Sequence, residues 1–294
     1  METSKEAPED AITASERTGT TIPTDKPPKR PNAFTELMNR SKQSKPTPPP
    51  APPAPPSASR HIFKDRTGLG AYIASPTSFP ASVVISHNEN YVLIHDLYPK
   101  SSVHLLLLPR NPEISDTHPL TALTTNAAFL EEVKVEAARA VKIVAAELRR
   151  RYGQYSAAEK AREEALEAIM ASDADIPTEE ALEAQLPKGR DWEAEVMVGV
   201  HAHPSMSHLH IHILSRDRHS PALKHRKHYN SFATPFFVPI ADFPLEDGDP
   251  RWHPGREGYL QGDMKCWRCG QNYYGRFKQL KAHLEGEFEG WRGE

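Results

Sequence analysis

Cysteine is almost absent from this sequence. The 294 residues include two cysteines, Cys266 and Cys269, which lie too close together in the chain to staple a fold. Such a pair is typical of a metal site in a reducing compartment rather than of a secreted disulfide framework. Long apolar runs are also lacking: none approaches the roughly 20 residues that span a bilayer, and the first residues lack the apolar core of a signal peptide. These absences predict a soluble, intracellular protein without membrane association.

A strong charge of one sign is missing too. The formal net charge is −3, so no global field draws the chain to nucleic acid, and any such binding must come from local patches. Hydrophobic residues make up only 38% of the chain. This fraction is low for a fully packed globule and predicts that part of the chain stays unfolded.

Proline indicates where the unfolded part lies, since 13 of the 28 prolines precede residue 57. Residues 1–60 are therefore expected to form a disordered tail, in which the proline-rich stretch 46–56 is extended. A basic run at residues 26–31 is a candidate nuclear-import signal. Just after it stand three apolar residues that would share one face of a helix, either as a docking motif for a protein partner or as an incidental cluster: Phe34, Leu37 and Met38.

From about residue 61 the pattern becomes globular. Apolar residues recur at helical spacing from Leu130 to Leu148, which predicts one long amphipathic helix. β-rich runs bounded by turn residues stand on both sides of this helix: residues 83–86, 91–96, 103–108, 195–203 and 208–214. Strands, one long helix and strands again predict an α+β domain with a mainly antiparallel sheet.

Composition suggests the boundaries of the units. The α+β domain is expected over residues 61–245 and a small separate unit over residues 246–294. Residues 153–190 are rich in alanine and glutamate and are interrupted by proline, which predicts a solvated helical insertion. No chemistry is evident in this insertion.

The most informative stretch is residues 208–214, where histidine alternates with leucine and isoleucine. Successive side chains of a strand point to opposite faces, so His208, His210 and His212 are expected to line one face. The apolar residues between them would enter the core. His201 and His203 would add imidazoles from the neighbouring strand.

Three interpretations fit this pattern. The first is a half-buried strand whose polar face happens to carry histidine, which three consecutive alternations disfavour. The second is a catalytic metal site, because two histidines two positions apart on a strand can share a zinc ion. The third is nucleophilic catalysis at phosphorus, because imidazole, with an unperturbed pKa of about 6.5, is largely an uncharged nucleophile at neutral pH. Neighbouring imidazoles can then fix its tautomer and protonate a leaving group.

The same stretch resembles the signature of the histidine-triad superfamily of nucleotide hydrolases and transferases. The resemblance extends to the lead-in at residues 201–207, the trailing segment 220–232 and the unit at residues 96–109. Together these segments look like the aprataxin branch, the DNA-adenylate hydrolases. The branch implies a histidine-triad fold followed by a zinc finger.

The resemblance implies a role for each matching position. His210 would attack the α-phosphorus and form an adenylyl-histidine, while His208 would hold the His210 ring in its tautomer. His212 and His201 would contact phosphate oxygens or serve the leaving group. Asp96 would accept hydrogen bonds from the ribose hydroxyls, with turn capping as the alternative. The other matching residues would surround the phosphates or the DNA end, with surface solubility as the alternative for the lysines: Lys100, His104, Ser205, Met206, Lys224 and Lys227.

The sequence departs from this branch in three places. The tail has no room for the N-terminal phosphopeptide-binding domain of the larger members, and the insertion at residues 153–190 is foreign to the pattern. Position 102 is serine, where relatives often carry a basic residue. Phosphate contacts in that loop are therefore expected to differ.

The two cysteines belong to a metal constellation. Cys266 and Cys269 can place two thiolates on one metal, and His283 and Glu287 follow at helical spacing, one turn apart. These four residues would form a tetrahedral zinc site, and the shorter members of the branch resemble this pattern. A redox or accidental cysteine pair is the alternative. The zinc would be structural, because a module of this size is unfolded without metal.

The fourth ligand depends on a helix that must continue through Gly286, and Glu285 and Glu289 are its alternatives. Basic and aromatic side chains around the site suit a nucleic-acid contact, although the aromatic ones would equally serve a small core: Arg268, Arg276, Lys278, Lys281, Trp267, Tyr273 and Tyr274.

The resemblance implies a DNA 5′-adenylate hydrolase that removes AMP from abortive ligation intermediates in single-strand break repair. We expect a monomer that is nuclear, with a cytoplasmic pool as the alternative. Its expected partners are DNA with adenylated 5′ ends or nicks and a protein bound by the tail, and its product is AMP. Two alternatives remain: a general histidine-triad hydrolase of small adenylates and a non-enzymatic DNA-end-binding scaffold.

Overall fold

The computed structural model describes residues 66–172 and 177–294. Six strands form one sheet in the order β1-β2-β3-β5-β4-β6, and every pair of neighbours is antiparallel. The strands are β1 (Val84–His87), β2 (Tyr91–His95), β3 (His104–Pro109), β4 (Val196–His201), β5 (Ile211–Ser215) and β6 (Phe237–Pro239). The predicted α+β fold with an antiparallel sheet is confirmed. The basic run 26–31 and the apolar residues Phe34, Leu37 and Met38 lie outside the described residues.

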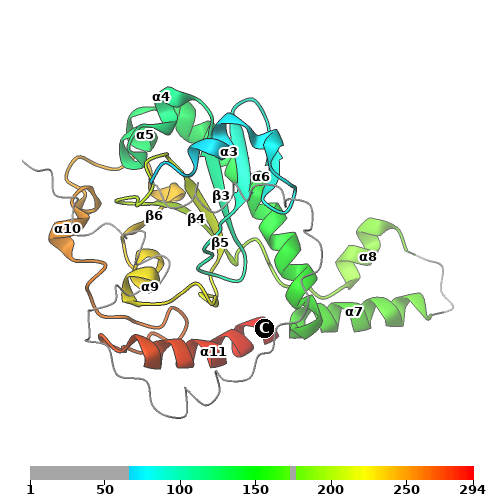
Figure 1. The fold of residues 1–294 in the computed structure, drawn as a ribbon. Coiled ribbons are helices and arrows are strands. Elements are labelled where there is room, and N and C mark those ends of the chain that lie inside the picture. Colours follow the sequence, from blue (N-terminus) through cyan, green and yellow to red (C-terminus); the bar gives the residue numbers. More distant parts are fainter. Residues whose placement is uncertain (1–65, 173–176) are drawn as a thin grey trace, which may run out of the picture.

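Helices flank this sheet and extend beyond it (Figure 1). The α-helices are α3 (Gly70–Ala74), α4 (Pro112–Ser115), α5 (Pro119–Thr125), α6 (Ala127–Tyr152), α7 (Ala157–Met170), α8 (Glu179–Gln185), α9 (Arg226–Ala233), α10 (Pro254–Glu257) and α11 (Phe277–Gly293). Short 3-10 turns lie at Pro76–Ser78, Gly153–Tyr155, Ile240–Asp242 and Pro250–Trp252. None of the helices in the described ranges has the length and apolar character needed to cross a membrane.

The sheet separates two apolar layers, because alternate side chains of each strand point to opposite faces. On β3, Leu105 and Leu107 join the main core beneath α5 and α6, whereas Leu106 and Leu108 join a second cluster with Tyr72 of α3. The long helix predicted from its apolar spacing is α6. It buries Leu130, Val133, Val144 and Leu148 against the sheet.

The last helix connects the two expected units. In its C-terminal half, Phe288 and Trp291 enter the main core, and in its N-terminal half, Leu280 and Leu284 pack on the loop that carries Cys266. The small C-terminal unit therefore shares its core with the α+β domain and is not a separately packed module.

The insertion at residues 153–190 contains α7 and α8, which project from the body of the molecule (Figure 1). Its base is tied down by Trp192, whose indole N–H donates to Glu159 Oε1 over 2.8 Å. Farther out, Leu166 and Met170 are exposed. The helices thus stand largely in solvent.

The strands around the histidine stretch are shorter than the sequence suggests. β4 ends at His201 and β5 begins only at Ile211. Between them, backbone groups bond outside the sheet: Ser207 N–H donates to Arg66 O over 2.9 Å, and Leu209 N–H donates to Ser115 O over 2.7 Å. Residues 202–210 therefore form a loop at the end of the sheet.

Candidate active site and metal centre

A cleft lies at the sheet face turned away from α6. The space inside it is about 730 Å³, a figure that includes the open solvent at its mouth. One part of its wall is apolar and is formed by Leu69, Tyr72, Ile94, Leu106 and Met206. The other part is polar and is formed by Asp96, Lys100, His201, Ser205, His210 and His212.

A chain of hydrogen bonds fixes the tautomers of two buried imidazoles. The Lys100 backbone N–H donates to His104 Nδ1 over 3.1 Å, so the proton of this ring lies on Nε2. His104 Nε2–H in turn donates to His212 Nδ1 over 3.0 Å, which places the proton of the second ring on its own Nε2. His212 Nε2 is buried and has no hydrogen-bond partner among the described residues. The His212 ring therefore offers one N–H donor to the cleft.

His201 is a second buried imidazole beside it. The ring centroids of His201 and His212 are 4.4 Å apart, and His201 Nε2 also has no hydrogen-bond partner in the described part of the chain. Burial lowers the pKa of His201 and of His212 well below the ordinary value for histidine. Burial likewise lowers the pKa of His104 to about 4, with Asp96 partly offsetting the effect. These three rings are uncharged at neutral pH.

His210 has the opposite arrangement. Its Nδ1 lies 2.8 Å from the backbone carbonyl oxygen of His208, which can only accept, so Nδ1 carries the proton and Nε2 keeps its lone pair. The ring lines the cleft, and its centroid is 4.9 Å from that of His212. The cleft thus combines an imidazole that can act as a nucleophile with neutral imidazoles that can donate.

The prediction that three histidines share one strand face is wrong, because β5 begins only at Ile211 and both His208 and His210 precede it. His210 still lines the cleft with His212. The His208 side chain lies outside the cleft: its Nε2 is 3.8 Å from Asp116 Oδ1, and a Cβ on Gly70 would lie 3.0 Å from its ring. The group that holds the His210 tautomer is the backbone carbonyl of His208. His203 also lies away from the cleft, with its ring 6.4 Å from that of His118.

The predicted ligands of phosphate and of the DNA end divide into two groups. Lys100, Ser205 and Met206 line the cleft. His104, Lys224 and Lys227 are not part of its wall. His104 cannot surround a phosphate, because it is buried and both ring nitrogens are hydrogen-bonded. It stands behind His212 instead.

Asp96 stabilises the turn between β2 and β3, which precedes His104. Its Oδ1 accepts the Tyr98 N–H over 2.8 Å, as the turn-capping alternative anticipated, and its Oδ2 lies 3.4 Å from His104 Nδ1. Asp96 also lines the cleft. Asp96, His104 and His212 form a compact group of potential metal ligands, but both nitrogens of His104 and Nδ1 of His212 are already engaged in the hydrogen bonds described above.

Several cleft residues were not singled out from the sequence. Phe232 packs its edge against His201 and His212, with ring centroids 4.7 and 5.1 Å away. His228 and Phe232 belong to the trailing segment that carried the family resemblance, which was the signal for them. Tyr72 lies on a short helix with no motif in the sequence. Burial raises the pKa of Tyr72 to about 12, so it is a neutral phenol at physiological pH.

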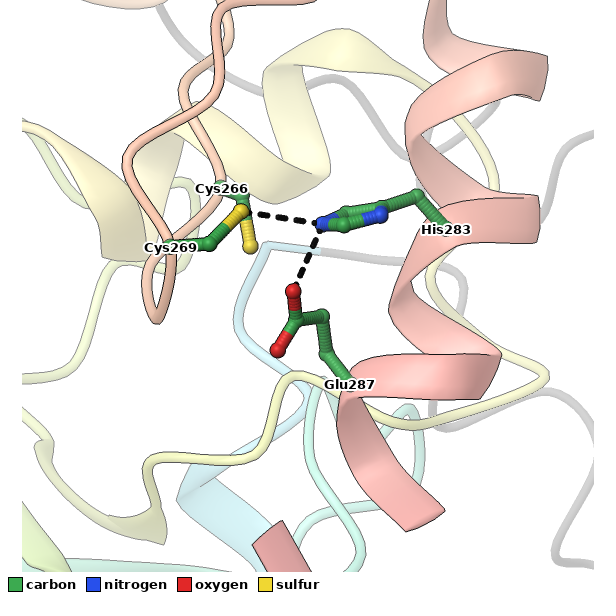
Figure 2. A group of neighbouring side chains, drawn as sticks. All are labelled: Cys266, Cys269, His283 and Glu287. Carbon is green, nitrogen blue, oxygen red and sulfur yellow. Dashed lines mark hydrogen bonds and ion pairs between the residues drawn. The ribbon is translucent and has the colours of Figure 1, made fainter. Parts of the chain in front are cut away.

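The C-terminal unit gathers the four predicted metal ligands (Figure 2). Cys266 and Cys269 come from one loop, while His283 and Glu287 project from the same face of α11. The donor atoms of all four lie within 4.8 Å of one another. Cys269 Sγ is 3.2 Å and Glu287 Oε1 is 3.0 Å from His283 Nε2. Two thiolates, an imidazole and a carboxylate in this arrangement fit a tetrahedral zinc ion.

The helix continues through Gly286 to Gly293, as the fourth ligand requires. Glu287 Oε2 also accepts a hydrogen bond from Arg268 Nη1 over 2.8 Å, the kind of outer contact that orients a metal-binding carboxylate. The alternative ligands point elsewhere: Glu285 is bonded to His219 over 2.8 Å, and Glu289 pairs with Arg292. Glu287 is therefore the residue positioned for a metal.

The basic and aromatic side chains of this unit serve different purposes. Arg268 pairs with Glu287 and Glu294, and Tyr273 is buried. Tyr274 is 55% exposed, and the Arg276 guanidinium lies 5.4 Å from the centroid of its ring. Of these residues, Tyr274 and Arg276 are therefore placed to contact nucleic acid, whereas Tyr273 is not.

An antiparallel sheet with buried histidines around a cleft, joined to a Cys₂-His-Glu site, defines a histidine-triad hydrolase with a C-terminal zinc finger. Family profiles agree with this class. The HIT domain profile matches residues 79–219, and the profile of the C2HE / C2H2 / C2HC zinc-binding finger matches residues 233–290.

Individual relatives narrow the class. An aprataxin-like protein of Schizosaccharomyces pombe is 34% identical over 263 residues, which cover 90% of this chain and 95% of the relative. An aprataxin-like protein of Saccharomyces cerevisiae is 33% identical, over 76% of this chain and 95% of the relative. The crystal structure of the aprataxin orthologue Hnt3 in complex with DNA has a TM-score of 0.59 at 32% identity and covers 77% of this chain and 96% of that one. The chain therefore belongs to the aprataxin family, the histidine-triad hydrolases that act on adenylated DNA.

Proposed function

We propose that this protein hydrolyses 5′-adenylated DNA with His210 as its nucleophile. The observation that carries the assignment is the tautomer of His210: the His208 carbonyl holds the proton on Nδ1, so Nε2 of this cleft-lining ring is unprotonated. Nε2 would attack the α-phosphorus, and the bond from this phosphorus to the oxygen of the DNA 5′-phosphate would break. Water would then attack the adenylyl-histidine and release AMP, which restores the imidazole.

The neighbouring imidazoles suit the transition state of this reaction. Charge on the oxygens of the transferring phosphoryl group is stabilised by hydrogen-bond donors that are already oriented. His212 supplies such a donor through Nε2–H, because His104 accepts from Lys100 and donates to His212. His201 Nε2 is the second buried ring atom available for this purpose. Lys100 adds positive charge to the wall of the cleft.

The rest of the cleft suits a nucleoside. The apolar side chains of Leu69, Ile94 and Leu106 offer a surface for a purine base, and Asp96 lies where a ribose hydroxyl can donate to its carboxylate. A solved structure of Hnt3 contains DNA and guanosine; it has a TM-score of 0.56 at 31% identity and covers 77% of this chain and 96% of that one. These observations support a purine nucleotide as the occupant of the cleft.

Exposed basic and aromatic side chains suit a contact with the DNA end. Lys224 and Lys278 are exposed, and Tyr274 and Arg276 form an exposed aromatic and cationic pair. The solved complex of Hnt3 with DNA supports the same partner for this chain. Because phosphate contacts release counterions, binding to DNA should weaken steeply with salt.

We assign a structural role to the zinc. A closed set of four protein ligands leaves no open position for a substrate, which distinguishes structural from catalytic zinc. The metal would tie the loop of Cys266 and Cys269 to α11 and so hold the finger on the catalytic domain. We also propose that the protein acts as a monomer in the nucleus, where abortive ligation of DNA breaks takes place.

Comparing two substrates tests the proposed function. Purified protein is given 5′-adenylated nicked DNA or a small AMP conjugate, and turnover of each is measured. A DNA-adenylate hydrolase should have a much higher kcat/KM for the DNA. Equal turnover of both would favour the general hydrolase, and DNA binding without turnover would favour the scaffold.

A further inference from the structure

The segment after β5, residues 216–224, is a junction between the catalytic turn and the zinc-finger helix. We name it the junction loop. Its Asp217 is fully buried and accepts hydrogen bonds from Ser102 N–H over 3.0 Å and from the Ser102 hydroxyl over 2.7 Å. It therefore fixes one side of the turn between β2 and β3, the turn that carries Asp96 and Lys100.

A second bond fixes the other side of that turn. The Ser220 hydroxyl donates to the carbonyl oxygen of Pro99 over 2.6 Å. This carbonyl belongs to the same peptide group as the Lys100 N–H, which sets the tautomers of His104 and His212. Because a peptide group is planar and rigid, any rotation that moves the Pro99 carbonyl also moves the Lys100 N–H.

Three side chains of the zinc-finger helix α11 contact the junction loop. The Lys281 ammonium donates to Leu223 O over 2.8 Å and to Ser220 O at 3.4 Å. One turn later, Glu285 is bonded to His219 Nε2 over 2.8 Å. Farther along, Phe288 stacks on the His219 ring, with centroids 3.9 Å apart. Positions 281, 285 and 288 share one helix face by their spacing.

We propose that Lys281 is a positioning residue for the hydrolysis, an inference that rests on the proposed function. Lys281 binds the carbonyl oxygens of Ser220 and Leu223 in the junction loop, and the Ser220 hydroxyl binds the Pro99–Lys100 peptide group. Through His104, the N–H of this peptide group determines that His212 carries its proton on Nε2, the nitrogen that donates to the cleft. Charge-assisted hydrogen bonds such as those of Lys281 are stronger than neutral ones. Lys281 thus acts on the reacting phosphorus through the chain of bonds and not by contact with DNA.

The test replaces Lys281 with methionine, which keeps the aliphatic stem and removes the ammonium. We measure kcat and KM on 5′-adenylated nicked DNA and on the small AMP conjugate, together with zinc content and melting temperature. A small misplacement of catalytic groups can lower a rate by about 100-fold, so kcat should fall about 10- to 100-fold on both substrates while KM for DNA changes little. Lys281→Arg should restore most of the rate, because a guanidinium also donates to carbonyl oxygens. Lys160→Met, an exposed lysine on α7, is the matched control.

A second variant separates positioning from folding. Ser220→Ala breaks the bond to Pro99 and leaves α11 intact, so it carries the test alone if Lys281→Met does not fold. It should lower kcat in the same way, and the double variant should lose little more than either single one. Unchanged kcat in the two folded variants, fully additive losses or a rise in KM for DNA alone would overturn the proposal. Failure of the unmodified protein to hydrolyse adenylated DNA would instead contradict the proposed function.

Discussion

Replacing His104 with leucine probes the donor chain without removing any side chain from the cleft wall. In the native protein His104 Nε2–H donates to His212 Nδ1 over 3.0 Å, and this bond keeps the His212 proton on Nε2. Leucine cannot donate. His212 would then place its proton on either nitrogen, and in one of the two tautomers an Nε2 lone pair would face the phosphate oxygens.

The magnitude follows from the loss of one oriented donor. Removing such a donor from a preorganised site lowers kcat by about 10²- to 10³-fold. The buried His212 Nδ1 would also lose its partner, which costs about 1–3 kcal/mol of folding stability. Affinity for adenylated DNA should change little, because His104 is buried and does not line the cleft.

The assay is single-turnover cleavage of 5′-adenylated nicked DNA, with binding and melting temperature measured on the same preparations. His87→Leu is the control, since His87 is an exposed histidine on β1. A folded His104→Leu protein that cleaves within threefold of the native rate would refute the tautomer argument. A loss of DNA binding that accounts for the whole effect would refute it as well.

Three further predictions address the nucleophile, the pKa of a buried imidazole and the metal. The His210→Ala protein should show almost no turnover and still bind adenylated DNA. Native protein that is denatured during turnover at alkaline pH, where the P–N bond persists, should carry AMP on the peptide of residues 208–212 by mass spectrometry. Near-native cleavage by the variant would exclude His210 as the nucleophile. Burial lowers the pKa of His104 to about 4, so between pH 6.5 and 4 the unfolded state binds more protons than the folded state does. The free energy of unfolding therefore decreases as the pH falls through this range. His104→Leu should weaken this dependence of the melting temperature on pH. Elemental analysis should find about one zinc per chain. Cys266→Ser should lower the zinc content, speed up amide hydrogen exchange in α11 and reduce DNA binding. Full zinc occupancy in that variant would contradict the ligand set.

The sequence by itself determined the features that depend on neighbouring residues. Alternation over residues 208–214 predicted that Leu209, Ile211 and Ile213 are buried, and all three lie in the main core. The metal site was predicted from the spacing of its ligands, because two cysteines lie close together and His283 and Glu287, one helical turn apart, share a helix face. Such features survive in any fold that contains the strand or the helix.

Only the tertiary structure decided how the histidines are used. The His208 side chain lies outside the cleft because the flanking N–H groups of residues 207 and 209 donate to the carbonyl oxygens of Arg66 and Ser115, which are distant in the sequence. His104 stands behind His212 because the pairing of β3 with β5 brings their ring nitrogens, from segments distant in the sequence, to 3.0 Å. Periodicity fixes the face on which a side chain lies, but the partner of each polar atom depends on segments that only folding brings together. For imidazole, whose two nitrogens change roles with their partners, that long-range choice sets the chemistry.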